Sequence, residues 1–283
     1  MIRIGIVCDS TCDLGPQWLA QHDVRMVPLK VLFDSVSYLD WIDLSPEEFY
    51  VKLAASPTLP KTSQPSPADF ATAYAELADA GYTEIVSVHL TSALSGTFES
   101  ATMAAVDSPV PVRIVDTKTV SMATSLAIKA AIEARDAGGS AAEVESAARG
   151  AAESSRLFFV LDTLEYLVKG GRAGKAAGLA ASVLNIKPIL TFTPEGTIEP
   201  FKKVKGLKKA LAELAAHVAT DSAGKQLRLS VLHGAAPELA EQMISALDAA
   251  GVSYELDTVG SVGAVIGTYA GPGAVGVAYY PKS

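Results

Sequence analysis

An apolar run that ends in a cluster of hydroxyls constrains the fold of this chain more than any other stretch. Residues 85–90 read IVSVHL, and Ser92, Ser95 and Thr97 follow around Gly96, before a helix-like pattern. In open α/β proteins, ligands bind where a parallel strand ends and a helix begins, because the free N–H groups there favour an anion. The stretch predicts either an anion-binding turn or, in the simpler interpretation, a helix cap and a turn.

The alternation of strand and helix patterns predicts an α/β chain in two parts. Short apolar runs at 2–7, 24–33 and 112–115 are separated by capped helical patterns, which favours an N-terminal parallel-sheet α/β domain. From residue 157 onward a hairpin at 187–204 is mixed with helices, which is typical of a mixed α+β domain. The length of 283 residues also suits two domains. We therefore expect domains at 1–156 and 157–283.

Composition excludes several classes of function. The net charge of −8 argues against nucleic acid as a partner, since nucleic-acid binding needs a basic surface. No run reaches the roughly 18 apolar residues of a membrane span, and the N-terminal sequence does not resemble a signal peptide, so a cytoplasmic protein is expected. Cys8 and Cys12 do not have zinc-ligand spacing, so we expect small, reduced, buried side chains and no metal site.

The usual enzyme signatures are missing from the sequence. It has no Gly-x-Ser-x-Gly nucleophile elbow, no Walker loop and no His/Cys metal motif. His89 lies beside the hydroxyl cluster and could act as a base for Ser92 or Ser95, which would make the chain a serine-dependent esterase or thioesterase. Because His89 also lies on an apolar strand, a hydrogen-bonded core histidine is the other interpretation.

Four further features are candidates for binding. Three prolines stiffen the loop 59–67, which presents Thr62 and Ser63 or is an ordinary connector. Arg172 follows a double glycine, which leaves the backbone room to approach a ligand. Lys203 and Lys205 belong to a lysine cluster that either meets a phosphate or an acidic partner or is a solvated face. The fourth is a glycine-rich stretch at 260–276 that permits backbone-lined contact with a ligand.

Six motifs in sequence order resemble the DegV family of fatty-acid-binding proteins, which includes the acyl-carrying subunits of bacterial fatty acid kinase. Together they extend across essentially the whole chain, which makes the resemblance specific although each motif alone is weak. The motifs are DST at 9–11, TSQPS at 62–66, LSGT at 94–97, LVKGGR at 167–172, KPI at 187–189 and GTYAGPG at 267–273.

The resemblance implies a fatty acid buried between the two domains, with its carboxylate held by hydroxyls. Thr62, Ser63 and Ser95 match the family's hydroxyl positions, and Ser92 is a further donor at the same turn. Arg172 matches the arginine associated with the acyl-phosphate end and kinase docking. The family usually has histidine at Tyr269, so this difference bears on phosphorylation more than on lipid binding. Lys203 and Lys205 are expected, together with Arg172 and Tyr269, to face the phosphate or the partner.

The expected function is that of a non-catalytic carrier in phospholipid metabolism. It binds a palmitate-like fatty acid without any cofactor and presents the carboxylate to the ATP-binding subunit of a fatty acid kinase. Hydroxyl donors suit such a head group, and the tail gains about 0.8 kcal/mol per buried CH₂. The alternatives are the serine esterase described above and a lipid sensor that has no kinase partner.

Overall fold

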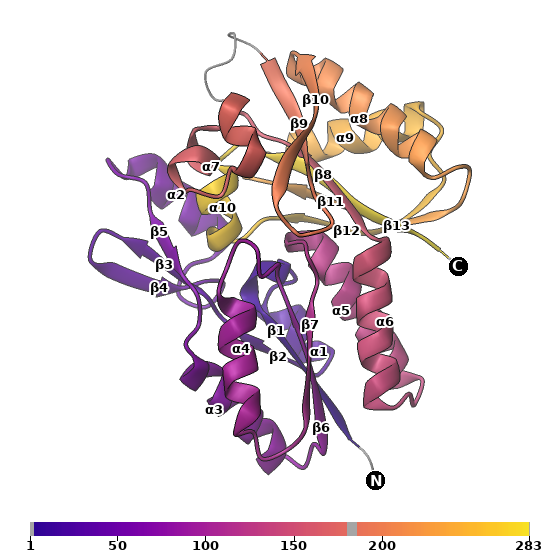
Figure 1. Ribbon diagram of the computed structural model, residues 1–283. Coiled ribbons are helices and arrows are strands. Elements are labelled where there is room, and N and C mark those ends of the chain that lie inside the picture. The colour runs from indigo at the N-terminus through magenta and orange to yellow at the C-terminus, as the bar shows by residue number, and fades with distance from the viewer. Residues whose placement is uncertain (1–2, 180–185, 283) are drawn as a thin grey trace.

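The computed structural model describes residues 3–179 and 186–282, and it contains two main sheets (Figure 1). The first sheet is parallel, with strand order β2-β1-β6-β7. Its strands are β1 (Ile4–Asp9), β2 (Val24–Val27), β6 (Glu84–His89) and β7 (Val112–Asp116). Residue 2 of the predicted first strand lies outside the described residues. The 3-10 helix η1 (Ser10–Cys12) and helix α1 (Pro16–Gln21) connect β1 to β2.

Helices cover both faces of the parallel sheet. On one face, Phe70 and Tyr74 of α3 (Pro67–Asp79) and Ala101 of α4 (Thr97–Val106) pack on the strands. On the other face, α5 (Ser121–Asp136) and α6 (Ala141–Ser154) bury an alanine-rich surface. Helix α3 begins with a capping box, in which the Ser66 side chain accepts from Asp69 N and the Asp69 carboxylate accepts from Ser66 N. This doubly covered parallel sheet confirms the fold class predicted for this half.

The second sheet is mixed and has the order β10-β9-β8-β13-β11-β12. In the order of the chain its strands are β8 (Arg156–Val160), β9 (Ile186–Phe192), β10 (Ile198–Lys205), β11 (Leu227–His233), β12 (Tyr254–Ser261) and β13 (Val275–Pro281). Strands β9 and β10 form the predicted antiparallel hairpin. Helices α8 (Leu207–Asp221) and α9 (Pro237–Ala249) pack on the sheet's outer face. All strands from β8 onward belong to the mixed sheet, and none before it does. The domain division proposed at 156/157 stays a prediction.

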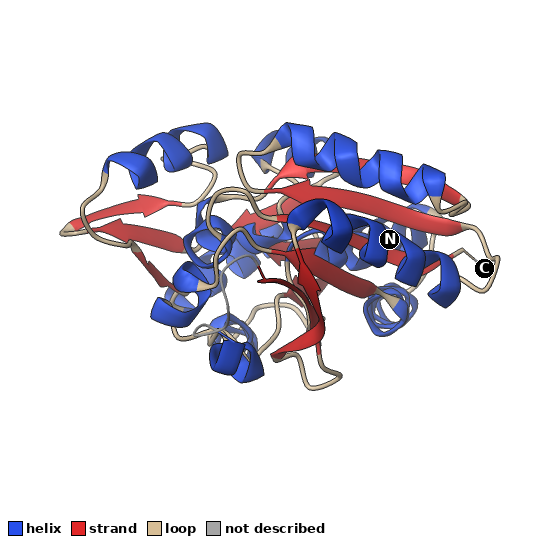
Figure 2. Ribbon diagram, turned by 90° about the horizontal axis from the view of Figure 1, so that it is seen from above, coloured by secondary structure: helices blue, strands red, loops and turns tan. Residues whose placement is uncertain are grey.

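Pro28 divides the apolar run at 24–33, which the sequence predicts as a single bent or edge strand. Residues before it form β2 of the parallel sheet, and residues after it form β3 (Lys30–Phe33) of a separate antiparallel sheet. That small sheet has the order β4-β3-β5, with β4 (Val36–Leu39) and β5 (Lys61–Ser63), and it projects to one side of the molecule (Figure 2). Proline has no N–H to donate, which explains the break between the two sheets.

The apolar core between the two main sheets combines residues from both halves of the chain. The inner face of the mixed sheet packs against β3, α5 and α2 (Pro46–Ala55), and it contributes residues such as Phe159, Leu190 and Ala278. Two short helices complete this layer, α7 (Glu165–Lys169) and α10 (Ala264–Ala270). Helix α10 lies inside the glycine-rich stretch for which the sequence predicted no helix. A 3-10 helix, η2 (Gly174–Leu179), follows α7.

Candidate functional site

A cavity of about 270 Å³ lies in this interlayer core. Its walls are mostly apolar and come from both halves of the chain. The parallel-sheet half contributes Leu29, Leu90 and Val120, the mixed sheet contributes Phe159, Phe192 and Leu232, and α10 contributes Val265 and Ile266. An apolar cavity with a few polar groups is the usual form of a site for a small organic ligand.

The polar groups of the cavity are linked to one another by direct contacts. Thr62 Oγ1 and the Tyr269 hydroxyl are 2.5 Å apart, and the Arg172 guanidinium carbon lies 5.1 Å from the centre of the Tyr269 ring. Arg172 Nε also donates to the Leu94 carbonyl, at 3.4 Å, directly before Ser95. Together with Ser63, these side chains line the cavity. The predicted residues Thr62, Ser63, Ser95, Arg172 and Tyr269 therefore lie at one cavity.

Local backbone features hold this polar cluster in place. Thr62 lies on β5, whose register with β3 places it opposite Val31, so a paired strand fixes its position. Tyr269 fits beside Gly170, where an added Cβ would lie only 2.4 Å from Tyr269 Cδ1. The double glycine that precedes Arg172 thus makes room for the tyrosine ring. Arg172 then folds back, and its Nη1 donates to the Gly170 carbonyl at 2.9 Å.

Ser95 has a structural role in addition to its place in the cavity wall. Its Oγ accepts from Thr97 N at 3.3 Å and lies 2.9 Å from Thr97 Oγ1, at the start of α4. The turn of the simpler interpretation is therefore confirmed, but the cap is not, because the N-cap of α4 is Gly96 and no side chain caps this helix. Sequence reasoning missed Gln64, which also lines the cavity and lies over Gly96, where a Cβ would be 2.4 Å from its Nε2.

A second pocket, of about 290 Å³, adjoins the polar end of the cavity. We call it the outer pocket, and Thr62, Arg172 and Tyr269 line both spaces. The outer pocket also carries the cationic side chains of Lys61 and Lys169. A single layer of side chains therefore separates the polar end of the cavity from a basic surface pocket.

Three of the predicted residues lie elsewhere. Ser92 was expected among the carboxylate donors, but it is exposed, does not line the cavity, and its Oγ accepts from Lys118 Nζ at 3.3 Å. The reason is that Ser92 N donates to Asp116, which turns this residue toward the end of β7. Lys203 and Lys205 are exposed on β10 and line neither the cavity nor the outer pocket, so a partner-facing role for them stays a prediction.

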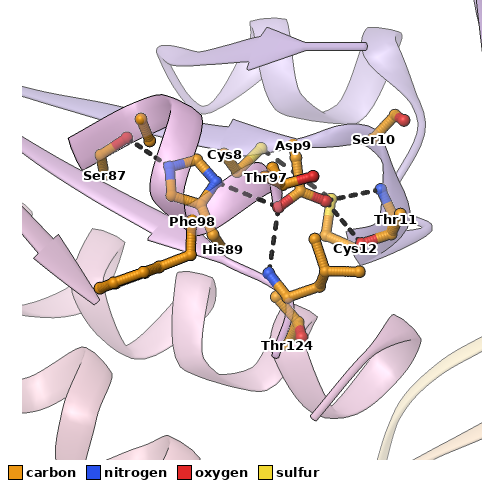
Figure 3. A network of polar contacts seen from close by, with 12 residues as sticks. Cys8, Asp9, Ser10, Thr11, Cys12, Ser87, His89, Thr97, Phe98 and Thr124 are labelled. Carbon is orange, nitrogen blue, oxygen red and sulfur yellow. Dashed lines mark hydrogen bonds and ion pairs between the residues drawn. The ribbon is translucent and has the colours of Figure 1, made fainter. Parts of the chain in front are cut away.

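His89 belongs to a buried network and not to either serine proposed for it (Figure 3). Its Nδ1 lies 3.0 Å from Asp9 Oδ2, and its Nε2 lies 2.7 Å from Ser87 Oγ, which in turn accepts from Tyr74. A carboxylate on Nδ1 makes that nitrogen the donor, so Nε2 accepts from Ser87. This network occupies the ends of the adjacent strands β1 and β6.

The network resembles a Ser-His-Asp triad in its order, but no substrate can reach it. Ser87 and His89 have no exposed surface, and Asp9 is 1 % exposed. An esterase needs a nucleophile that contacts its substrate. Neither Ser92 nor Ser95 bonds to His89, so the structure contradicts the esterase alternative. The interpretation of His89 as a hydrogen-bonded core residue is confirmed.

Cys8 and Cys12 are buried free thiols, as predicted. Their sulfur atoms lie 3.9 Å apart, and the contact with Cys12, together with burial, raises the pKa of the Cys8 thiol. Across residues 3–179 and 186–282, no group of three or more His, Cys, Asp or Glu side chains is placed to hold a metal ion. None of the helices described there is long and apolar enough to cross a bilayer.

Two buried acids near the cavity were missed by sequence reasoning. Asp13 and Asp40 are 4 % and 1 % exposed, and both accept backbone N–H groups at the start of α10. Burial raises the pKa of Asp13 to about 8 and that of Asp40 to about 7. The sequence signal beside Asp13 was the polar cluster after β1, in which Asp9 was expected either to point into a cleft or to cap the next segment. Asp9 forms the cap, by accepting from Thr11 N.

The fold and the site together define a class: a two-sheet α/β protein whose buried cavity suits a ligand with one polar end and an apolar remainder. The family model described as "Uncharacterised protein, DegV family" matches residues 3–282. This chain belongs to the DegV family.

Relatives of known structure have the same fold over their full length. A DegV family protein from Thermus thermophilus, described as fatty acid binding, has a TM-score of 0.93 and 33 % identity, covering 99 % of this chain and 100 % of that one. A stearic acid-binding protein from Eubacterium ventriosum has a TM-score of 0.87 and 28 % identity, covering 100 % and 99 %. A DegV domain-containing protein from Streptomyces coelicolor is 37 % identical over 97 % of both chains.

Proposed function

We propose that this protein binds one long-chain fatty acid, of about the size of palmitate, in the interlayer cavity. The observation that carries the proposal is the cavity itself, with apolar walls and one linked polar cluster formed by Thr62, Tyr269 and Arg172. The fatty acids bound by the Thermus and Eubacterium relatives support it. In this arrangement the acyl chain lies along Phe159, Leu232 and their neighbours, and the carboxylate meets the polar cluster.

The energetics of the cavity suit such a ligand. Each buried CH₂ contributes about 0.8 kcal/mol, so the tail supplies most of the affinity. A carboxylate that enters the cavity needs hydrogen bonds, since an unpaired buried charge is expensive. The hydroxyls of Thr62, Ser63 and Ser95 provide donors, and the nearby Arg172 provides positive charge.

The test is the identity of the lipid in the purified protein. Native mass spectrometry is expected to show a mass increment equal to one fatty acid, and delipidated protein is expected to bind palmitate in calorimetry. Thr62→Val should weaken that affinity about tenfold, which is the effect of losing one strong hydrogen bond. Thr72→Val on the exposed face of α3 is the matched control and should not change it. Delipidated, folded protein that binds no fatty acid would overturn the proposal.

We further propose that the protein presents the bound carboxylate to a partner kinase that uses ATP, and so serves phospholipid synthesis in the cytoplasm without catalysing a reaction itself. The outer pocket supports this proposal, because Thr62, Arg172 and Tyr269 line both it and the cavity. Lys61 and Lys169 supply positive charge for phosphate groups in that pocket. The carboxylate would need only a local shift of Tyr269 to meet a phosphoryl donor.

Reconstitution tests this second proposal separately. Loaded protein, labelled ATP and the ATP-binding subunit of a bacterial fatty acid kinase are expected to yield acyl phosphate. Arg172→Gln should lower this yield when variant and wild type are compared at the same content of bound fatty acid, which native mass spectrometry measures. Loaded wild-type protein that gives no acyl phosphate with the kinase subunit from its own source would contradict presentation. That outcome would favour a lipid sensor.

A further inference from the structure

Helix α10 follows a strand of the mixed sheet, but its first turn is bound by two aspartates from the other half of the chain. Gly263 N donates to Asp13 Oδ1 at 2.8 Å, and Ala264 N donates to Asp40 Oδ1 at 2.9 Å. The N–H groups of a first helical turn have no partners within the helix. Here they are satisfied by carboxyl groups that lie 224 and 250 residues away in the sequence.

The second oxygen of each carboxyl group binds a further segment of the parallel-sheet half. Asp13 Oδ2 accepts from Ser121 Oγ at 2.5 Å, and Ser121 both begins α5 and lines the cavity. Asp40 Oδ2 accepts from Ser10 Oγ at 2.8 Å, directly after β1. Each acid therefore connects α10 to a fixed element of the parallel-sheet half.

The far end of α10 carries Tyr269, which contacts Thr62 at the polar end of the cavity. Between the two ends, Val265 and Ile266 form part of the cavity wall. A helix rises about 1.5 Å per residue, so Tyr269 lies only about 8 Å along the axis from the bound first turn. Gly267 packs so closely on α2 that a Cβ there would lie 2.5 Å from Phe49 Cε1. A shift of the first turn would thus be transmitted to Tyr269.

We propose that Asp13 and Asp40 are positioning residues that hold α10 in place, so that Tyr269 meets Thr62 and the cavity closes around the fatty acid. We call the hydrogen bonds of these two acids to the start of α10 the latch. This inference rests on the proposed function. The latch acts on the head group only through Tyr269, because neither acid lines the cavity or the outer pocket.

The cost of burying the two acids is consistent with a specific role. In the described part of the chain neither carboxyl group has a cationic partner within ion-pair distance; their titratable neighbours are Asp9, at the end of β1, and Tyr50 of α2, besides each other. Burial raises both pKa values toward neutrality. An apolar contact would avoid this cost, but it could not accept three N–H groups of α10.

A double-mutant cycle tests the latch against a merely structural role. Palmitate affinity is measured for delipidated wild type, Asp40→Ala, Tyr269→Phe and the double variant. We expect each single variant to bind about tenfold more weakly, and the double variant to bind no more than about twofold more weakly than either. Independent effects would multiply to about a hundredfold. That result, or unchanged affinity in Asp40→Ala, would overturn the latch.

Controls separate the possible failures. Tyr279→Phe removes a buried hydrogen bond to Asp221 in the other core, so it should lower stability and leave affinity unchanged. Where Asp40→Ala does not fold, Asp40→Asn keeps the shape and the acceptor oxygen. Because the amide oxygen still accepts from Ala264 N, the palmitate affinity of Asp40→Asn should lie within twofold of wild type, and adding Tyr269→Phe to it should weaken binding about tenfold, as in the wild type. Binding about tenfold weaker in folded Asp40→Asn would overturn the latch. Failure of wild type to bind palmitate would instead refute the proposed function.

Discussion

Replacing Asp40 by asparagine is expected to flatten the dependence of the protein's stability on pH. Asp40 is fully buried, and burial raises its pKa from 3.8 to about 7. In the unfolded chain the carboxyl group ionises near pH 4, while in the folded protein it keeps its proton until about pH 7. The folded state therefore binds one more proton between these pH values, and the free energy of unfolding falls as the pH rises.

The magnitude follows from the width of this window. One group contributes about 1.4 kcal/mol per pH unit, so about three pH units correspond to about 4 kcal/mol for Asp40. The contribution is fully present below pH 4 and is lost by about pH 7. Asparagine mimics the protonated acid, since its amide oxygen can still accept from Ala264 N. Asp40→Asn should match the wild type near pH 4 and be the more stable protein at pH 8.

Urea unfolding followed by circular dichroism at several pH values between 4.5 and 8 measures the difference. The slope of the free energy of unfolding against pH should be smaller in the variant by about 1.4 kcal/mol per unit between pH 4.5 and 6.5. Asp43→Asn is the matched control, because Asp43 is an exposed acid of the same loop that also accepts a backbone N–H. Parallel slopes for wild type and Asp40→Asn would refute the reasoning.

Three other substitutions or treatments test separate parts of the structure. Ser87→Ala leaves His89 Nε2 without its donor and should cost about 1–3 kcal/mol in thermal unfolding, with unchanged palmitate affinity; a loss of affinity would contradict a purely structural network. Ala274→Leu fills part of the cavity wall and should shift preference toward shorter acyl chains in competition binding; an unchanged preference would place the acyl chain elsewhere. Cys8 and Cys12 should react with a thiol reagent only after unfolding in urea, and rapid labelling of the folded protein would disprove their burial.

Much of the fold could be predicted because local signals agreed with the final structure. Ser45 and Ser66 each precede a proline and lie three residues before an acid, and both form capping boxes in the structure. The alternation of apolar strands and capped helices was enough to predict a parallel sheet in the first half. The hairpin of β9 and β10 could be predicted equally well, because a turn sequence separates two strand-like runs.

Local patterns marked Thr62, Ser63, Ser95 and Arg172 as separate candidates, but their meeting at one site was predicted only through the resemblance to a family. Nothing local to Thr62, Arg172 or Tyr269 indicates that three segments more than 90 residues apart converge on one cavity. The sequence also did not indicate in which direction each side chain points. Ser92 and Ser95 look equivalent in the same turn, but a hydrogen bond from Ser92 N to Asp116 turns one of them away.

Helix α10 shows most clearly why the remainder could not be predicted. Its segment is rich in glycine, which disfavours a helix by about 1 kcal/mol per residue, so local propensity argues against it. The helix forms because carboxyl groups from a distant part of the chain satisfy its first N–H groups and because Gly267 fits against Phe49. The glycines lower the predicted helix propensity of this segment, and they also allow the helix to pack closely. The position of Tyr269 at the head of the cavity is therefore a tertiary property, and a latch that holds it must be sought in Asp13 and Asp40 and not within the helix itself.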